Sequence, residues 1–429
     1  MAAMNDMQDH PILGQVILGY SPMIDRQRQV VATRLTVFPE RPDAQPDMAA
    51  LLVVLAEVWP DEGAGLSLTL RALDGAAPKA TAPAAPLAGP PVSLNIAGEV
   101  LLQARLAASP GPQWMIEVPA FMAADPAHAA ALRALHDSGH TLLIKGRPVA
   151  ELPRELLPCF SHSIIDVNEE RRSSAPPPFG VRAITTVQAG VRSQVAMEAA
   201  FQRGALAALG WPLDDPVLPG KGRAAVPPDL QVIMALINGV DRELPASQLE
   251  ALLKRDATLA FRLMRYLNSP AFGLQVEINS FGHALMMLGH NRLKRWLALL
   301  LVSASKDAHM KPVMFAALRR GLLMEELVRN SGDAEMRGEM FICGVFSLLD
   351  LMLRQPFDEL LKTLPVPERV QQALGGGGGP FMPYLELVRA IENESLFDVR
   401  ECADRLFMSL AEINRALLVA LRAARQLDS

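Results

Sequence analysis

The chain has 429 residues, half of them hydrophobic and a fifth charged, which is enough for two domains that each bury a core. A formal net charge of -5 and a pI near 6.0 leave no positive surplus to displace the counterions of a nucleic acid, so nucleic acid is not an expected partner. No apolar run approaches the ~20 residues of a bilayer span, and the N-terminus lacks the basic stretch of a secretory signal. We therefore expect a cytoplasmic protein with no membrane insertion.

The first half of the chain alternates strand-like and helix-like runs. Residues 16–38 resemble two β-branched strands joined by a Pro/Asp turn, which predicts a hairpin. Further buried strands are predicted within 91–97, 112–121 and 140–146. A helix is predicted over 125–139, because its apolar residues share one face and a glycine closes it. This alternation favours a parallel α/β arrangement, with a barrel as one version of it.

Proline-rich stretches divide the chain into parts. Residues 73–91 and 168–180 are predicted to be surface connections, since they are too rich in Ala, Pro and polar residues for a core element. The strongest boundary lies within 211–229, after which strand-like runs almost vanish. The predicted division is an N-terminal tail, an α/β domain, a linker and an all-α domain, at residues 1–13, 14–215, 216–229 and 230–429.

The second half is predicted to be a helical bundle. Asp256 is placed to cap a helix whose apolar residues recur at helical spacing, and Asn268-Ser269-Pro270 ends that helix. Ser280 is placed to cap the next helix, and Gly289 to close it. The glycine run within 373–381 lacks the Lys-Ser/Thr of a phosphate loop and is interpreted as a connection between helices.

These helices carry motifs that resemble the HDOD domain, over roughly residues 225–420. The motifs are the Asp256–Leu259 helix, the Asn268–Phe272 turn and the helix from Ser280 to Gly289. The resemblance implies a helical module that docks other signalling proteins. The residues that carry it are Asp256, Leu259, Asn268, Ser269, Pro270, Phe272, Ser280, Ala284, Leu288 and Gly289.

The first half resembles a degenerate EAL domain, the cyclic di-GMP phosphodiesterase barrel. The similar stretches are the strand pair in 17–31, "VSLNIAGEVLL", "PQWMIEVPAF" and "ALRALHDSGHTLLI". An EAL domain followed by an HDOD domain is a recognised bacterial signalling architecture. The two resemblances together imply a barrel related to the TIM barrel, followed by an all-α helical bundle.

The EAL resemblance also identifies the positions of the family's metal ligands, and most of them have changed. Asn95 and Glu117 match the family's Asn and Glu ligands, and Asp166 is retained. Arg34 stands at the signature Glu, and Lys145-Gly146 replaces an Asp-Asp pair. Hydrolysis of this type needs a carboxylate cluster around two divalent cations. We therefore expect no catalytic residues, no bound metal and no cofactor; the further departures are Ile164 for a Lys, Thr185 and Gln188 for two Glu, and Leu209 for a Gln.

The leading hypothesis is a non-catalytic bacterial signalling protein whose HDOD half docks protein partners. A second hypothesis is a receptor that binds cyclic di-GMP or another nucleotide without hydrolysis, through Arg34, Lys145 and Arg147; the competing interpretation is that these side chains are solvated or ion-paired. A third is a residual metal-dependent phosphohydrolase in the helical half, where isolated His and Asp residues, among them His309 and Asp307, would supply ligands. A fourth is nucleic-acid binding by a local basic patch within 291–296; the competing interpretation is that these charges form the solvated face of a helix.

Overall fold

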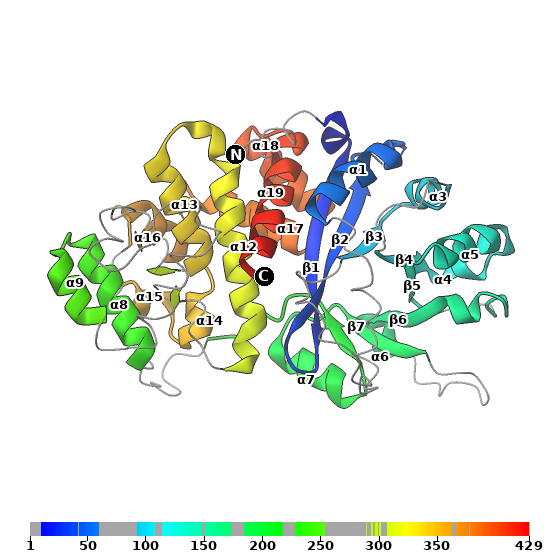
Figure 1. The fold of residues 1–429 in the computed structure, drawn as a ribbon, viewed down its shortest axis with the longest axis horizontal. Coiled ribbons are helices and arrows are strands. Elements are labelled where there is room, and N and C mark those ends of the chain that lie inside the picture. The colour runs from blue at the N-terminus through cyan, green and yellow to red at the C-terminus, as the bar shows by residue number, and fades with distance from the viewer. Residues whose placement is uncertain are drawn as a thin grey trace, which may run out of the picture. The chain divides into compact units, whose positions relative to one another are not determined.

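The structure is a computed structural model, and its described residues form two compact units (Figure 1). One unit combines Met1–Asp215 with Arg389–Ser429, and the other is Pro216–Val388. The structure describes residues 10–41, 43–59, 92–107, 114–147, 151–172, 184–217, 228–253, 307–362, 366–376 and 378–428, with a few single positions between 289 and 301.

The first unit contains a closed barrel of eight strands. The six strand pairs from β2–β3 to β7–β8 are parallel, whereas β1 is antiparallel to both β2 and β8. This order confirms the predicted α/β barrel, which opens with a hairpin. The strands are β1 (Val16–Asp25), β2 (Val30–Pro39), β3 (Val92–Ile96), β4 (Met115–Pro119), β5 (Thr141–Lys145), β6 (Phe160–Asp166), β7 (Thr185–Ala189) and β8 (Ala207–Leu209).

Two layers fill the barrel interior. The lower layer is apolar, and because it draws residues from seven strands it can lie only inside the barrel. Successive side chains of a strand alternate between its faces, so the residues two positions away along a strand point into the same interior. In β1, β2, β4 and β5 these residues are polar, and with Ser93 and Asn95 of β3 they form an upper layer towards the carboxyl ends of β2 to β5. The lower layer contains Met23, Ala32, Met115, Leu143, Ile164, Val187, Ala189, Ala207 and Leu209; the upper layer contains Ser21, Arg34, Thr36, Ser93, Asn95, Glu117 and Lys145.

Helices follow most of the barrel strands, as the alternating sequence pattern predicts. Asp47 caps α1 by accepting hydrogen bonds from two backbone N–H groups, and Ser193 caps α7. On the outer face of the barrel, Ile24 and Ala208 pack against Met197 and Phe201 of α7. The helices are α1 (Met48–Val58), α3 (Glu99–Ala107), α4 (Ala120–Ala124), α5 (Ala129–Asp137), α6 (Val167–Arg172) and α7 (Gln194–Gln202).

The C-terminal segment from residue 389 onwards belongs to the barrel unit. It contains the end of α17 (Met382–Glu392), then α18 (Leu396–Leu406) and α19 (Leu410–Asp428). Asn414 of α19 is buried, and its side-chain amide donates to the carbonyls of Leu13 and Val16 at 2.7 and 2.8 Å and accepts from the Leu18 N–H at 3.1 Å. Figure 1 shows α19 (red) alongside β1 (blue). This unit therefore combines two distant stretches of chain, unlike the predicted all-α domain of residues 230–429.

The second unit is helical in its described part, which agrees with the predicted bundle. Two of its helices, α12 and α13, approach each other closely at Gly344, where an added Cβ would lie 2.5 Å from the Arg320 carbonyl oxygen. Within the described residues, no helix combines the length and hydropathy needed to cross a membrane. The helices are α8 (Pro228–Asp241), α9 (Ala246–Leu253), α12 (Lys311–Leu327), α13 (Ala334–Phe346), α14 (Leu349–Leu353), α15 (Phe357–Leu360) and α16 (Glu368–Leu374).

Most of the predicted HDOD motif lies outside the described residues. This applies to Asp256, to the turn at 268–272, and to Ser280, Ala284 and Leu288. Gly289 is described, and its φ of +71° is the left-handed conformation expected of a helix-closing glycine.

Candidate functional site

The centre of the upper barrel layer is an ion pair between Arg34 of β2 and Glu117 of β4. The Arg34 Nε and Nη2 atoms donate to the two Glu117 carboxylate oxygens at 2.9 and 2.7 Å. Glu117 is fully buried, and Ser93 adds a hydroxyl donor at 3.1 Å. A planar guanidinium that donates from two nitrogens matches a carboxylate better than any other side chain does. Both oxygens of this family metal-ligand position are therefore engaged by a cation of the chain itself.

Arg34 remains positively charged in this buried setting. Burial by itself lowers the pKa of Arg34, but the carboxylates of Glu117 and Glu394 outweigh that effect. The charge of Asp166 acts in the same direction, and the pKa of Arg34 is raised above its usual value. The upper layer thus contains a permanent cation where a metal-binding barrel would require an anion.

A second cation occupies the other surviving family ligand. Lys145, at the end of β5, donates from Nζ to the Asn95 carbonyl oxygen Oδ1 at 2.7 Å. The Asn95 amide donates in turn to the Thr36 hydroxyl at 3.0 Å. Burial lowers the pKa of Lys145, and the positive charge of Arg34 lowers it further, whereas Glu117 and Glu394 oppose both. The oxygen that Asn95 would offer to a metal therefore binds an amine.

Asp166 lies at the end of β6 and has a backbone partner. Its carboxylate accepts a hydrogen bond from the Asn168 N–H at 2.7 Å. It also passes close to Gly190, where an added Cβ would lie 2.6 Å from a carboxylate oxygen, and Gly190 has a φ of +76°. Asp166 contributes to the upper layer through its charge on Arg34.

The remaining positions where the family has acidic or polar ligands are now part of the barrel framework. Ile164 and Leu209 belong to the apolar lower layer. The Gln188 amide donates to the Ile165 carbonyl at 2.7 Å, and Thr185 is exposed at the start of β7. None of these four side chains supplies a carboxylate.

A further carboxylate enters the upper layer from the far end of the chain. Glu394 lies between α17 and α18, and its two oxygens accept from the Ser21 and Thr36 hydroxyls, each at 2.7 Å. The second oxygen also accepts from Arg34 Nη1 at 3.4 Å. Sequence reasoning missed this residue, because 360 positions separate it from Arg34 and it follows an ordinary helix end.

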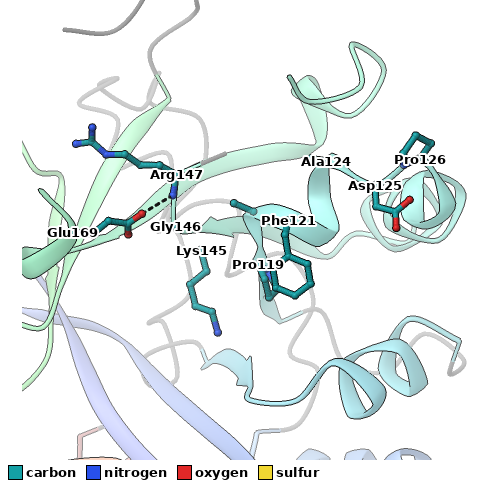
Figure 2. Close-up of a pocket in the computed structure, with 10 residues that line it drawn as sticks. Pro119, Phe121, Ala124, Asp125, Pro126, Lys145, Gly146, Arg147 and Glu169 are labelled. Carbon is teal, nitrogen blue, oxygen red and sulfur yellow. Dashed lines mark hydrogen bonds between the residues drawn. The ribbon is translucent and has the colours of Figure 1, made fainter. Parts of the chain in front are cut away.

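A pocket of about 680 Å³ opens beside the upper layer, at the carboxyl ends of β4 and β5 (Figure 2). Phe121 of α4 is 64% exposed at this pocket, and the Arg147 N–H donates to a Glu169 carboxylate oxygen at 3.1 Å. Figure 2 shows the side chains of Lys145 and Arg147 leaving the chain in different directions. The three residues predicted to bind nucleotide are therefore divided: Lys145 and Arg147 both line the pocket, whereas Arg34 lies in the barrel interior and is not part of the lining.

The residues of the upper layer do not fit a pair of divalent cations. A metal ion at Glu117 would have to displace Arg34, and one at Asn95 would have to displace Lys145. Across the described ranges, no three His, Cys, Asp or Glu side chains are grouped to hold a metal ion.

The candidate ligands of the helical half have other partners where they are described. Asp307 accepts from the His309 N–H at 2.9 Å and from Arg354 at 3.4 Å, whereas His283 and His290 lie outside the described residues. In the basic stretch at 291–296, Lys294 forms an ion pair with Asp241.

The comparison with protein families confirms the predicted HDOD domain in the helical half of the chain. The HDOD domain model matches residues 225–359. One curated relative, the uncharacterized protein YuxH of Bacillus subtilis, is 31% identical over 175 residues, covering 40% of this chain and 42% of the relative. Another, the cyclic di-GMP phosphodiesterase CdgJ of Vibrio cholerae, is 26% identical over 204 residues, 47% of each chain. This chain thus spans less than half the length of these relatives.

Similar solved structures include EAL domains. The PaMucR phosphodiesterase in complex with c-di-GMP is 19% identical, with a TM-score of 0.28. The match covers 50% of this chain and 97% of the PaMucR chain. The FimX EAL domain of Pseudomonas aeruginosa bound to c-di-GMP is 14% identical, with a TM-score of 0.25. This match covers 50% of our chain and 96% of the FimX domain. At these TM-scores the barrel assignment rests on its own closed strand order.

Proposed function

We propose that this chain is a non-catalytic cytoplasmic signalling protein of cyclic di-GMP pathways. Its EAL-like barrel has exchanged bound metal ions for cationic side chains, and its HDOD half docks other signalling proteins. The observation that supports the loss of catalysis is the bidentate pair of Arg34 with the buried carboxylate of Glu117. The HDOD match over residues 225–359 supports the docking role.

The charges of the upper layer support the proposed absence of metal-dependent hydrolysis. A divalent cation placed about 4 Å from the Arg34 guanidinium would be repelled by about 8 kcal/mol at an effective dielectric constant of about 20. Lys145 adds a second positive charge near the same place. The two surviving ligands, Asn95 and Glu117, would have to overcome this repulsion after losing their present partners, which is more than two oxygen ligands supply.

A hydrolysis assay tests this proposal. Purified full-length chain is incubated with cyclic di-GMP and Mg²⁺ or Mn²⁺, and the linear dinucleotide product is quantified. We expect no product above that of the heat-inactivated sample. Product formation that EDTA abolishes, and that Glu117→Gln removes, would contradict the proposal.

Docking by the helical half is tested through the predicted turn at 268–272. We expect proteins retained by the full chain from a native lysate to be lost from Phe272→Ala, while the same proteins stay bound to Glu401→Ala, which removes an exposed carboxylate of α18. Circular dichroism of both variants reports whether the helices remain folded. Equal retention by both variants would remove the turn from the docking surface.

A second candidate function, nucleotide binding without hydrolysis, is favoured by the pocket in Figure 2. Exposed Phe121 offers an aromatic face on which a base can stack, and Arg147 offers a phosphate-binding fork. If this candidate is right, calorimetry with cyclic di-GMP gives a binding signal. Phe121→Ala and Arg147→Ala should each weaken the affinity about tenfold or more, in line with about 1–3 kcal/mol for one lost base stack. The absence of heat with the parent chain would dismiss it.

A further inference from the structure

The position of Glu394 is not explained by a signalling barrel that has lost its metals. A glutamate from the C-terminal segment reaches the interior of the barrel, and three donors of β1 and β2 converge on it. Ser21 and Thr36 donate hydroxyl hydrogen bonds of 2.7 Å, one to each carboxylate oxygen, and Arg34 supplies the charge at 3.4 Å. The Glu394 side chain is only 16% exposed, so these contacts replace its hydration.

The backbone around Glu394 is fitted to the same place. Gly19 faces the interior at the β1 position paired with Thr36, and an added Cβ there would lie 3.0 Å from the Glu394 Cα and from the Ile391 carbonyl oxygen. Because Gly19 has no side chain, strand β1 leaves room for the turn that contains Glu394. Glu394 adopts a φ of +53°, a left-handed conformation that costs energy for any residue other than glycine. A side chain at this strained position indicates that its contacts compensate the strain.

The charges of the upper layer favour a further anion. Arg34 is paired with Glu117, whereas Lys145 donates to the neutral amide of Asn95. Glu394 supplies a negative charge that acts on both Arg34 and Lys145, in the direction that raises their pKa values. A continuous hydrogen-bond path also runs from Lys145 through Asn95 and Thr36 to Glu394.

We propose that Ser21, Arg34 and Thr36 form a carboxylate-binding site in the barrel interior, and that Glu394 of the chain's own C-terminal segment is its resident ligand. The site takes a single carboxylate on an unbranched chain, because two hydroxyls bind its two oxygens separately while Arg34 balances its charge. With Glu394 bound, the segment after residue 389 closes this side of the barrel and withholds Arg34 from anions in solution. This inference does not depend on the docking role of the helical half.

Chemical rescue tests the site directly. In the full chain, Glu394→Ala removes the ligand and leaves a space of about the size of acetate, whereas Glu401→Ala removes an exposed carboxylate of the neighbouring helix α18 as a matched control. Thermal unfolding is followed in sodium acetate and in sodium chloride of equal ionic strength. We expect Glu394→Ala to lower the Tm of the barrel transition by about 4–10 °C, and acetate to restore part of that loss. Neither the parent chain nor Glu401→Ala should distinguish the two salts.

The other outcomes are equally informative. An unchanged Tm in Glu394→Ala, or a lowered Tm that acetate and chloride affect alike, would overturn the proposal. Restoration by inorganic phosphate but not by acetate would overturn the assignment to carboxylates.

A double-mutant cycle keeps the proposal testable if Glu394→Ala does not fold. Glu394→Gln keeps the shape of the ligand without its charge, and Thr36→Val keeps the shape of the receptor without its donor. We expect the Tm losses of the two single variants to exceed, when added, the loss of the double variant, because both break the same contact. Additive losses would overturn the proposal. Hydrolysis of cyclic di-GMP, the failure of the proposed function, is a separate result read from a different assay.

Discussion

The two layers of the barrel interior share strands β1, β2, β4 and β5 but are held together differently. The lower layer joins apolar side chains such as Met115 and Leu143, each of which needs only neighbours of suitable size. The upper layer, two residues further along the same strands, joins Glu117 and Lys145 to specific partners with the correct charge and geometry. An apolar layer tolerates many substitutions of similar volume, whereas a buried ionic layer depends on each partner being present.

The comparison explains how a metal site can be lost without loss of the barrel. Carboxylates that no longer bind metal ions would remain as unpaired buried charges, which a folded protein does not tolerate. Arg34 engages Glu117, and Lys145 engages the amide of Asn95, so in the function that we propose these cations take the role of the metal ions. Glu394 then balances the additional positive charge.

The largest effect is expected from breaking the central pair on one side only. Glu117→Ala leaves the Arg34 guanidinium buried beside a vacated space, and we expect a loss of about 3–5 kcal/mol in the free energy of unfolding. The joint replacement Arg34→Met with Glu117→Leu should cost less than Glu117→Ala alone, since neither member of the pair is left without its partner. Chemical denaturation of the parent chain and the two variants checks both statements, and a double variant less stable than Glu117→Ala would refute them.

In the lower layer, the free energy of unfolding should depend on the volume of the buried side chains, because this layer carries no charges. Leu143→Ala removes buried apolar atoms, with an expected cost of about 2–4 kcal/mol. Leu143→Met, which preserves volume, should cost less than about 1.5 kcal/mol. Denaturant midpoints with unchanged m-values are the measurement, and equal losses for Ala and Met would show that packing does not hold this layer.

An intermediate effect is expected at the anchor of the C-terminal segment. Asn414→Ala removes three hydrogen bonds to the backbone at the entry of β1 and leaves buried groups without partners. We expect about 2–3 kcal/mol of destabilisation, together with faster proteolytic cleavage after residue 389. Asn393→Ala, an exposed position before Glu394, is the matched control and should behave as the parent chain.

The smallest effect concerns pH and Lys145. Because burial lowers the pKa of Lys145 in the folded state, the unfolded chain binds its proton more tightly, and stability rises with pH between the lowered pKa and the ordinary value of 10.5. Lys145→Met removes this contribution. We therefore expect the stability of the parent relative to Lys145→Met to increase as the pH approaches 10.5 from below. A relative stability that falls over that interval would mean that the folded state favours the ammonium.

Sequence patterns predicted those features that depend on neighbouring residues. The hairpin over residues 16–38 and the strands around Asn95 and Glu117 follow from local alternation of apolar residues. Resemblance to the EAL family drew attention to Arg34 and Lys145, but spacing alone left open whether they are solvated or paired.

The C-terminal segment could not be assigned from sequence. Its amphipathic helices fit a bundle and a barrel covering equally well, and contacts such as Asn414 with Leu18 join residues 396 positions apart. Likewise, the contact of Glu394 with Arg34 joins residues 360 positions apart and could not be predicted from the sequence.

The proposed exchange of metal ions for side-chain cations is tested most directly by Mn²⁺ binding. Electron paramagnetic resonance of the full chain titrated with Mn²⁺ separates free from bound ions without any need for substrate. We predict the spectrum of free Mn²⁺ at all submillimolar concentrations, with the same result for the parent and for Glu117→Gln. Bound Mn²⁺ in the parent that Glu117→Gln releases would contradict the account, because Glu117 would then be a metal ligand in spite of Arg34.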